Sequence, residues 1–407
     1  MNCRNCGKLL TQEFINLGYA PPSNAYLSEE DLNNPEVYFP LRTKVCDGCW
    51  LVQTEDYTDA DKLFTSDYAY FSSASSSWLE HAKKYSGKII DTLSLTSENF
   101  VIEVASNDGY LLKNFVEAGI PCLGIEPTTS TALAAEKLNI PVKKEFFTER
   151  LAQDLKASGQ CADLIIANNV FAHVPDINDF TAGMKACLKN TGTITIEFPH
   201  LLNLIKYSQF DTIYHEHYSY LSLLSVNNVV IKHGLRVFDV EKLHTHGGSL
   251  RVYLCHKNDS RETLPAVKEL LNVEDEFGLT DLNTYQNVQH EAEKIKNNLV
   301  KFLIEQKLSG KKVVGYGAAA KGNPILNFAG VRSDLLPVIF DAAHAKQDKY
   351  MPGNHIKILS AEELTAFRPD FIIVLPWNLI DEVLMQNDHL REAGTKFVTA
   401  IPELRVF

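Results

Sequence analysis

Residues 100–112 place a buried strand, a tight polar loop and the start of a helix directly one after another. The stretch is FVIEVASNDGYLL, and its apolar run gives way to small and polar residues before an apolar helical pattern begins. Such a junction presents backbone N–H groups and the positive end of a helix dipole to a polar ligand. Small side chains at Ser106, Asn107 and Gly109 allow the ligand to approach closely. We therefore expect a cofactor site at this loop.

A second strand, at 121–127, ends at Glu126. A carboxylate at the carboxyl end of a strand can accept hydrogen bonds from both hydroxyls of a ribose. The spacing from Glu103 through the loop to Glu126 resembles the first motif and second-strand acid of class I methyltransferases that use S-adenosylmethionine (SAM), and not a dinucleotide-binding G-x-G-x-x-G. That family often has glycine where this chain has Ala105, so we expect a slightly different approach to the methionine end of SAM. An ordinary strand-to-helix crossover without a ligand is the alternative.

The length of 407 residues predicts two or three domains, and 45% hydrophobic residues are enough for real cores. No apolar run approaches the roughly 20 residues of a membrane span, and the N-terminus lacks the apolar stretch of a signal peptide. We therefore expect a cytoplasmic protein with no membrane partner. The net charge of −12 also argues against nucleic acid as a partner.

Four of the eight cysteines stand in two C-x-x-C pairs, Cys3 with Cys6 and Cys46 with Cys49. Two such pairs can supply four thiolates in a tetrahedral shell, which suits zinc in a reducing compartment better than disulfides do. Four protein ligands leave no open position, so we expect the zinc to hold a small domain together. A nucleic-acid zinc ribbon is the alternative, but the segment 17–26 is not basic. The other cysteines stand among apolar neighbours and are predicted to be core: Cys122, Cys161, Cys187 and Cys255.

Residues 68–78, YAYFSSASSSW, are too aromatic for a linker and too rich in hydroxyls for a core strand. Their composition is typical of a functional loop. A packed connection between the zinc-binding module and the next domain is the alternative interpretation.

Strand and helix patterns alternate from residue 100 onward, with strands expected near 100–105, 121–126, 141–146, 161–168 and 192–198. This order predicts a parallel, doubly wound sheet. Two further strands, 235–243 and 248–255, have only a short glycine-rich connection, so that pair should be antiparallel. Together they fit the seven-stranded methyltransferase sheet. Ligands are expected at the carboxyl ends of the strands, which carry Asn107, Asp108, Glu126, Glu145, Phe146, Asn168, Asn169, Pro199 and His200.

The segment Tyr214–Tyr218, YHEHY, is the densest cluster of titratable and phenolic side chains in the chain. Acid–base chemistry is the favoured interpretation, because imidazole titrates near working pH and a nearby carboxylate can orient it. Ordinary surface histidines are the alternative, and a metal site is disfavoured because helical ligand pairs prefer i, i+4 spacing. His173 follows the strand that ends at Asn168 and should lie in the same layer, although a structural histidine is an alternative there. The turn His246–Arg251 is expected close to it.

An amphipathic helix is predicted over Thr284–Gln306, and a new domain is predicted behind it. Residues 311–323, KKVVGYGAAAKGN, are again strand, glycine turn and helix start, with Lys321 placed to meet a phosphate. Further strands at 335–341, 371–376 and 396–401 complete a second, smaller α/β unit. A NAD site is the alternative there, but the glycine spacing is not that of a dinucleotide-binding loop, and the first unit has the better ribose acid.

Together these motifs resemble a specific family, the SAM-dependent sugar C-methyltransferases of deoxysugar biosynthesis. The resemblance covers nearly the whole chain and rests on the paired cysteines and on Ser106–Gly109, Tyr214–His217, His246–Arg251, Gly315–Asn323, Pro352–Asn354 and Trp377–Asn378. The chain departs from the family at Gln347–Lys349, where relatives tend to have glycine in the middle.

The resemblance implies an α/β fold in three parts: a small zinc-binding domain (1–66), a central Rossmann-like SAM domain (67–283) and a C-terminal Rossmann-like domain that helps bind the nucleotide sugar (284–407). It implies C-methylation of a nucleotide-linked 4-keto-6-deoxysugar, usually at C3. The implied cofactors are SAM and a structural zinc ion. We expect the protein to act as a monomer on this small molecule.

Carbon beside a ketone becomes nucleophilic only when its proton is removed, so such an enzyme needs a positioned base. By position in the matching motif, His217 is the expected base, with Glu216 and Tyr214 orienting it or the substrate. Tyr68 and His173 match further active-site positions and would donate to the sugar oxygen. The expected cofactor contacts are Glu103, Ser106, Asn107, Asp108, Gly109, Glu126, Glu145, Phe146 and Asn168. The expected substrate contacts are Tyr70, His246, Arg251, Tyr316, Lys321 and Asn323.

Two other classes of function stay open. A nucleotide-sugar O- or N-methyltransferase would share the SAM loop, but a hydroxyl or amine needs less activation and does not call for the polar cluster as a unit. A zinc-containing scaffold with a degenerate SAM domain would bind no SAM.

Overall fold

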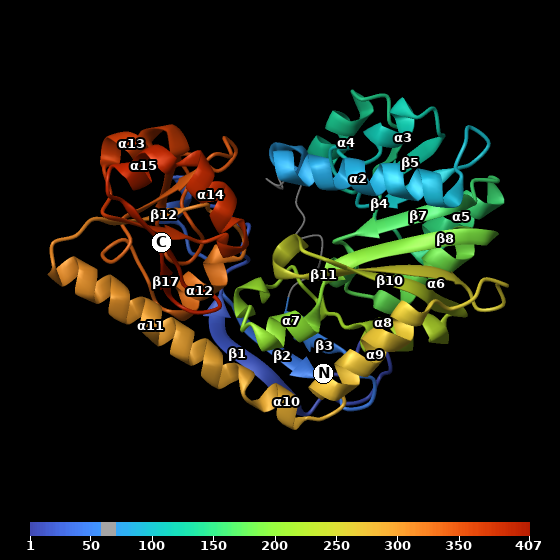
Figure 1. Cartoon of the computed structure of the whole chain (residues 1–407), viewed down its shortest axis with the longest axis horizontal. Coiled ribbons are helices and arrows are strands. Elements are labelled where there is room, and N and C mark those ends of the chain that lie inside the picture. The colour runs from blue at the N-terminus through green and yellow to red at the C-terminus, as the bar shows by residue number, and fades with distance from the viewer. Residues whose placement is uncertain (58–70) are drawn as a thin grey trace.

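The structure is a computed structural model that describes residues 1–57 and 71–407. Within these residues the chain forms sheets of four, seven and six strands. Figure 1 shows the seven-stranded sheet on the right with α2 (Ser76–Leu93) across one side, and the C-terminal unit on the left. The four-stranded sheet lies low between them, so the N-terminal module touches both larger units.

The N-terminal sheet draws its last strand from a distant part of the chain. Strands β1 (Gln12–Ala20), β2 (Phe39–Val45) and β3 (Val52–Thr54) are antiparallel neighbours, and β9 (Ser219–Tyr220) pairs with β3. The Thr54 hydroxyl donates to the His217 carbonyl at 2.7 Å, and the Thr54 N–H donates to the Tyr218 carbonyl at 3.1 Å. The histidine-rich segment is therefore attached to the edge of the N-terminal sheet.

The central sheet has the predicted doubly wound form. Its order is β10-β11-β8-β7-β4-β5-β6, with parallel pairing from β8 to β6 and β11 antiparallel to both of its neighbours. The strands are β4 (Val101–Val104), β5 (Cys122–Ile125), β6 (Val142–Lys143), β7 (Ala162–Asn168), β8 (Leu188–Pro199), β10 (Leu235–Leu243) and β11 (Ser249–His256). The predicted crossover strands and the predicted antiparallel pair are thus confirmed.

Both faces of this sheet are covered, because successive side chains of a strand point to opposite sides. On one face, Val101 and Leu164 pack in an apolar cluster with the buried side chains of α2. On the opposite face, Ile102 and Ile165 pack in a different apolar cluster. The covering helices are α2, α3 (Lys113–Glu117), α4 (Thr129–Glu136), α5 (Glu149–Ala157), α6 (Ile177–Cys187), α8 (Leu223–Lys232) and α9 (Pro265–Phe277). The buried side chains of α7 (Leu201–Lys206) instead pack in the cluster that the N-terminal module shares with the C-terminal unit.

The C-terminal unit is a second α/β sheet, in the order β14-β13-β12-β15-β16-β17. Its strands are β12 (Val313–Tyr316), β13 (Val338–Asp341), β14 (Lys357–Ser360), β15 (Phe371–Val374), β16 (Lys396–Thr399) and β17 (Arg405–Val406). Its helices are α12 (Gly322–Phe328), α13 (Leu364–Phe367), α14 (Ile380–Gln386) and α15 (Asp388–Glu392). The predicted connector helix is confirmed as α11 (Val288–Leu308), with the short α10 (Asn283–Gln286) ahead of it. The predicted strands did not include β14 and β17.

One apolar cluster joins the N-terminal module to the C-terminal unit. It includes Ile15 and Leu17 of β1, Ile295 of α11 and Ile325 of α12, together with Phe210 from the central part of the chain. The shared core fixes the three parts relative to one another. Short 3₁₀ helices complete the fold, at Asp31–Asn33, Ser72–Ala74, Phe171–His173, Phe210–Thr212, Thr245–Gly247, Ala361–Glu363 and Trp377–Leu379.

Membrane insertion has no helical candidate in the part of the chain that the structure describes. None of the helices there combines the length and the apolar character that a bilayer span needs.

Candidate functional site

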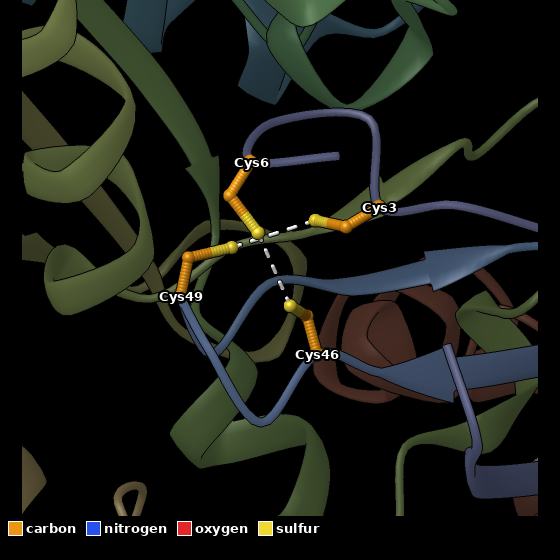
Figure 2. Close-up of side chains that lie close together, drawn as sticks. All are labelled: Cys3, Cys6, Cys46 and Cys49. Atoms are coloured by element: carbon orange, nitrogen blue, oxygen red, sulfur yellow. Dashed lines mark hydrogen bonds between the residues drawn. The ribbon is translucent and has the colours of Figure 1, made fainter. Parts of the chain in front are cut away.

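The four paired cysteines bring their Sγ atoms together (Figure 2). All four atoms lie within 4.8 Å of one another, and the contacts of Cys3 with Cys49 and of Cys6 with Cys46 are both 3.5 Å. Sulfur atoms about 2.3 Å from a tetrahedral zinc ion would lie about 3.8 Å apart. The predicted donor set therefore fits a closed zinc site.

The remaining cysteines lie apart from this cluster. Cys122, Cys187 and Cys255 are buried in the cores, as predicted, whereas Cys161 is only half-buried.

The loop after β4 is sharply bent. Ala105, Asn107 and Gly109 all have positive φ, of 56°, 50° and 79°. Side chains are uncommon in this region of backbone conformation. A Cβ at Gly109 would lie 2.5 Å from Ile140 Cδ1, so this position requires glycine. The backbone thus explains the glycine at position 109, whereas Ala105 and Asn107 adopt positive φ with side chains present.

The Glu126 carboxylate accepts hydrogen bonds from the loops that follow β4 and β5. Its Oε2 accepts from the Asn107 N–H at 3.0 Å, and its Oε1 accepts from the Thr128 N–H at 2.8 Å. Burial raises the pKa of this carboxyl, and the backbone donors oppose that rise. The side chains of Thr128 and Thr131 also interact with this carboxylate, so ribose hydroxyls would share its four lone pairs with these groups or displace them. The geometry fits the expected role.

Several buried polar atoms around this loop have no hydrogen-bond partner within residues 1–57 and 71–407. They are Glu103 Oε2, Ser106 Oγ, Asp108 Oδ1, Asn168 Oδ1 and both amide atoms of Asn169. Burial raises the pKa of Glu103 well above its ordinary value, and the charges of Asp108 and Glu126 add to the rise. Unsatisfied buried groups are costly, and a polar ligand at this loop would satisfy them. The amino-acid end of SAM fits this donor and acceptor set.

The 3₁₀ helix Ser72–Ala74, just ahead of α2, contacts the same loop. The Ser72 N–H donates to Asn107 Oδ1 at 2.9 Å, and the Ser73 N–H donates to Asp108 Oδ2 at 3.1 Å. This part of the predicted functional loop therefore touches the predicted cofactor site. Tyr68 and Tyr70 lie outside the described residues.

Not every predicted cofactor contact lies at this loop. Glu145 and Phe146 are exposed beyond the short strand β6, and 41% of Phe146 is accessible. Asn169 follows β7 with a φ of 53° and has a buried amide, so it joins the candidate contacts. Its place at a strand end beside Asn168 was the available sequence signal.

His217 is held in one tautomer by its neighbours. Its Nδ1 lies 2.7 Å from the Thr212 carbonyl, to which only an N–H can donate. The other nitrogen, Nε2, is therefore an acceptor in the neutral ring and lies 2.8 Å from the Tyr214 hydroxyl. Burial lowers the pKa of His217 well below its ordinary value, and the nearby His173 ring adds to this. His217 is consequently a neutral imidazole with its basic nitrogen on Tyr214.

His173 lies beside it, with ring centroids 4.5 Å apart. Its Nδ1 donates to the Glu216 carbonyl at 2.8 Å, and burial lowers its pKa to about 4. A neutral ring in this tautomer has an acceptor at Nε2. The expected donation from His173 to a sugar oxygen would require a protonated ring, and the role of His173 stays a prediction.

The Glu216 carboxylate does not orient His217 directly, because Thr212 occupies the ring's Nδ1. Instead, Glu216 Oε1 accepts two hydrogen bonds from Asn24, and the side chain is 1% exposed. His215 packs on the other side of the segment, where its Nε2 donates to the Pro40 carbonyl at 3.2 Å. Of the two histidines in the motif, only His217 thus faces Tyr214.

A cation from the C-terminal unit lies near this cluster. Lys321 Nζ donates to Asn378 Oδ1 at 2.6 Å and stands 5.2 Å from the Trp377 ring. Burial lowers its pKa, while the charge of Asp211 opposes that shift. Trp377 Nε1 donates to Asp211 Oδ2 at 2.7 Å, which ties the C-terminal unit to the central one.

The turn at His246 lies in the same contact region. A Cβ at Gly247 would lie 2.6 Å from Trp377 and 2.7 Å from Gln209 Nε2, so the turn fits closely beneath the C-terminal unit. The His246 ring is 5.2 Å from the Trp78 ring. Burial lowers the pKa of His246 to about 4, and the charge of Lys321 adds to this shift.

The other predicted substrate residues have structural neighbours. Arg251 is buried in β11, pairs with Glu197 and Glu241, and lies over the Tyr85 ring at 4.2 Å. Asn323 Nδ2 donates to the Ser23 carbonyl at 3.1 Å, while its Oδ1 accepts from neighbouring amides. Tyr316 is half-buried at the end of β12. None of these contacts places a substrate.

Three family models match consecutive parts of the chain. Residues 3–64 match a model described as "Putative zinc binding domain", residues 78–240 match a methyltransferase domain, and residues 244–402 match a C-methyltransferase C-terminal domain.

The chain is also similar to one curated protein along nearly its whole length. C-methyltransferase NovU of Streptomyces niveus is 33% identical over 404 residues, which cover 99% of this chain and 96% of that protein. Among solved structures, magnesium protoporphyrin IX methyltransferase of Synechocystis is 12% identical, covers 44% of this chain and 83% of its own, and has a TM-score of 0.36. The glycopeptide N-methyltransferase MtfA is 12% identical, covers 43% and 90%, and has a TM-score of 0.35. Likeness at this level supports nothing further about this chain.

Proposed function

The chain belongs to the C-methyltransferase family, and from this premise we propose that it methylates C3 of a nucleotide-linked 4-keto-6-deoxysugar through an enolate. The methyl donor is SAM, and the N-terminal module binds zinc through four cysteines. The observation that carries the proposal is the buried, neutral His217, whose basic Nε2 faces the Tyr214 hydroxyl.

The proposed base suits removal of a proton from carbon. A neutral imidazole is ready to accept a proton, whereas an imidazolium is not. The Thr212 carbonyl holds Nδ1–H, so Nε2 is the atom that takes the proton. Once protonated, Nε2 becomes a donor to the Tyr214 oxygen, and the Tyr214 O–H is released to donate to the enolate oxygen at C4.

SAM, when bound, supplies an electrophilic methyl group. The chain's own part is to hold the enolate carbon near it, in a region from which water is excluded. Lys321 is the proposed partner of the nucleotide diphosphate, since it brings a buried positive charge to the same region. The C-terminal unit would then bind the nucleotide while the central unit binds SAM.

A panel of nucleotide-linked 4-keto-6-deoxysugars with labelled SAM tests the proposal. We expect label in a product whose NMR spectrum shows a new methyl group on a ring carbon, with the proton at C3 lost or replaced. A methyl group on oxygen or nitrogen would assign the chain to the other transferase class. Failure of calorimetric titration to detect SAM binding would favour a scaffold.

Glu126→Ala is expected to weaken SAM binding by about 1.5–3 kcal/mol, since it removes a charged acceptor of the ribose hydroxyls. It also removes the acceptor of the Asn107 and Thr128 N–H groups, which adds to the loss. Calorimetric titration of SAM measures the change. Glu136→Ala is the matched control, because that exposed carboxylate pairs with Lys144 at the surface. Unchanged SAM affinity in Glu126→Ala would mean that the ribose binds elsewhere.

A further inference from the structure

The two oxygens of the Glu216 carboxylate have very different surroundings. Oε1 accepts from both the backbone N–H of Asn24 at 3.1 Å and its side-chain Nδ2 at 3.2 Å. Oε2 is buried and has no hydrogen-bond partner of good geometry among the residues that the structure describes, although the backbone N–H groups of Glu216 and Ser23 also interact with the carboxylate. A buried acceptor without a hydrogen-bond donor costs free energy, so a carboxylate at this position needs a functional explanation.

Asn24 is itself fixed from the other side. The Ser23 carbonyl accepts from Asn323 Nδ2 at 3.1 Å, and the Tyr26 hydroxyl donates to the Ala318 carbonyl at 2.6 Å. Ala318 belongs to the glycine-rich turn of the C-terminal unit, and Asn323 belongs to the first turn of α12 directly after it. The segment Ser23–Tyr26 of the zinc-binding module thus connects that turn to Glu216.

Glu216 also belongs to the turn that carries the proposed base. Its carbonyl accepts from His173 Nδ1 at 2.8 Å, and the His217 N–H donates to the Tyr214 carbonyl at 2.9 Å across it. A displacement of Glu216 would therefore displace the imidazoles beside it.

We propose that Asn24 is a positioning residue that holds Glu216 by Oε1 and leaves Oε2 to accept an O–H or N–H donor of the bound sugar. This inference rests on the proposed function, because it takes the Tyr214–His217 turn as the place where the sugar reacts. It gives the zinc-binding module a part in substrate recognition besides its part in folding.

The charge on Glu216 depends on the same contact. Burial raises the pKa of this carboxyl, and the backbone N–H of Glu216, both N–H donors of Asn24 and the backbone N–H of Ser23 oppose the rise by favouring the ionised form. The titratable groups that interact with it include the phenols of Tyr26 and Tyr220, whose own pKa values burial raises, so both are neutral.

A double-mutant cycle tests the inference. Asn24→Ala should lower kcat/KM for the sugar about 10-fold, with SAM affinity unchanged, because a hydrogen bond to a charged group is lost. In a Glu216→Gln background the same change should cost less than about 2-fold, because Asn24 acts through Glu216. Equal losses in both backgrounds, or no loss in either, would overturn the inference.

Infrared spectroscopy gives a second readout that needs no substrate. The carbonyl band of protonated Glu216, identified by its absence in Glu216→Gln, should appear at a pH about one unit higher in Asn24→Ala. If the pH midpoint of this band is the same in Asn24→Ala and in the wild type, the proposed role of Asn24 in binding Glu216 is wrong. A wild-type protein that methylates no keto sugar would instead defeat the proposed function, while this readout still decides the role of Asn24.

The matched control is Asn16→Ala, whose side-chain Oδ1 in the same module accepts a local hydrogen bond from the Gly18 N–H. Both readouts should be unchanged in this variant. Should Asn24→Ala fail to fold, Asn24→Asp keeps the size of the side chain and replaces its N–H donor by an oxygen. The double-mutant cycle and the infrared band are then measured with Asn24→Asp. The loss of kcat/KM should be at least as large as for Asn24→Ala, because two carboxylates would face each other.

Discussion

His217→Asn is expected to lower kcat by roughly 10²–10⁴, the usual contribution of a general base. SAM and the nucleotide sugar should still bind, because the variant leaves the loop after β4 and the C-terminal turn unchanged. Steady-state kinetics and calorimetric titration measure the two effects separately. Exchange of deuterium into the sugar beside the ketone, without methyl transfer, should slow in parallel with kcat.

His215→Asn is the matched control, since that ring packs against β2 and donates to the Pro40 carbonyl. Its kcat should stay near the wild-type value. If His217→Asn turns over at a near-normal rate, His173 or Tyr214 would be assigned as the base instead. Retained exchange with lost transfer would instead give His217 a role in placing the methyl acceptor.

The pH profile should also carry the signature of a buried base. Burial holds the pKa of His217 well below its ordinary 6.5, and protonation removes its basic lone pair. Activity that depends on this ring should therefore persist below pH 6.5 and fall only as the pH passes through the lowered pKa.

Tyr214→Phe distinguishes two routes for the proton. A neutral imidazole has one lone pair at Nε2, and the Tyr214 hydroxyl stands 2.8 Å from it. The sugar must either displace this hydroxyl or pass its proton through it. A loss as steep as that of His217→Asn would indicate passage through Tyr214, and a mild loss would indicate displacement.

Cys46→Ser is expected to remove zinc and unfold the N-terminal module. Structural zinc sites in small peptides contribute about 10–16 kcal/mol of apparent binding free energy, which becomes folding free energy. The effect should extend to the active site, because Thr54 of this module holds the His217 and Tyr218 backbone. Elemental analysis gives the metal content, and a thermal unfolding scan gives the loss of stability.

Cys161→Ser is the matched control for this prediction. That cysteine is half-buried and lies outside the four-sulfur cluster, so one zinc ion per chain should be retained. A folded, active Cys46→Ser protein without zinc would show that the metal is dispensable.

Local patterns were sufficient for most strands of the two larger units, but not for the strands of the N-terminal sheet, β1, β2, β3 and β9. Residues 100–112 predicted β4 and its loop, because an apolar run followed by small residues permits few other structures. The strands of the central sheet were predicted from their apolar sequence patterns, and the zinc cluster was predicted from two pairs of cysteines. The strands β14 and β17 were missed, since they are short and partly exposed and lack a continuous apolar pattern.

Only the tertiary structure decided how the site is assembled. The sequence nominated Glu216 as a neighbour that could orient His217, yet the Thr212 carbonyl occupies that place and Glu216 is bound by Asn24, 192 residues away. The neutral tautomers of His217 and His173 likewise follow from carbonyls that face their Nδ1 atoms. A residue's own sequence determines whether it suits a strand, a turn or a metal ligand. Its hydrogen-bond partners and its desolvation come from segments that meet only when the chain folds, so they leave no local pattern.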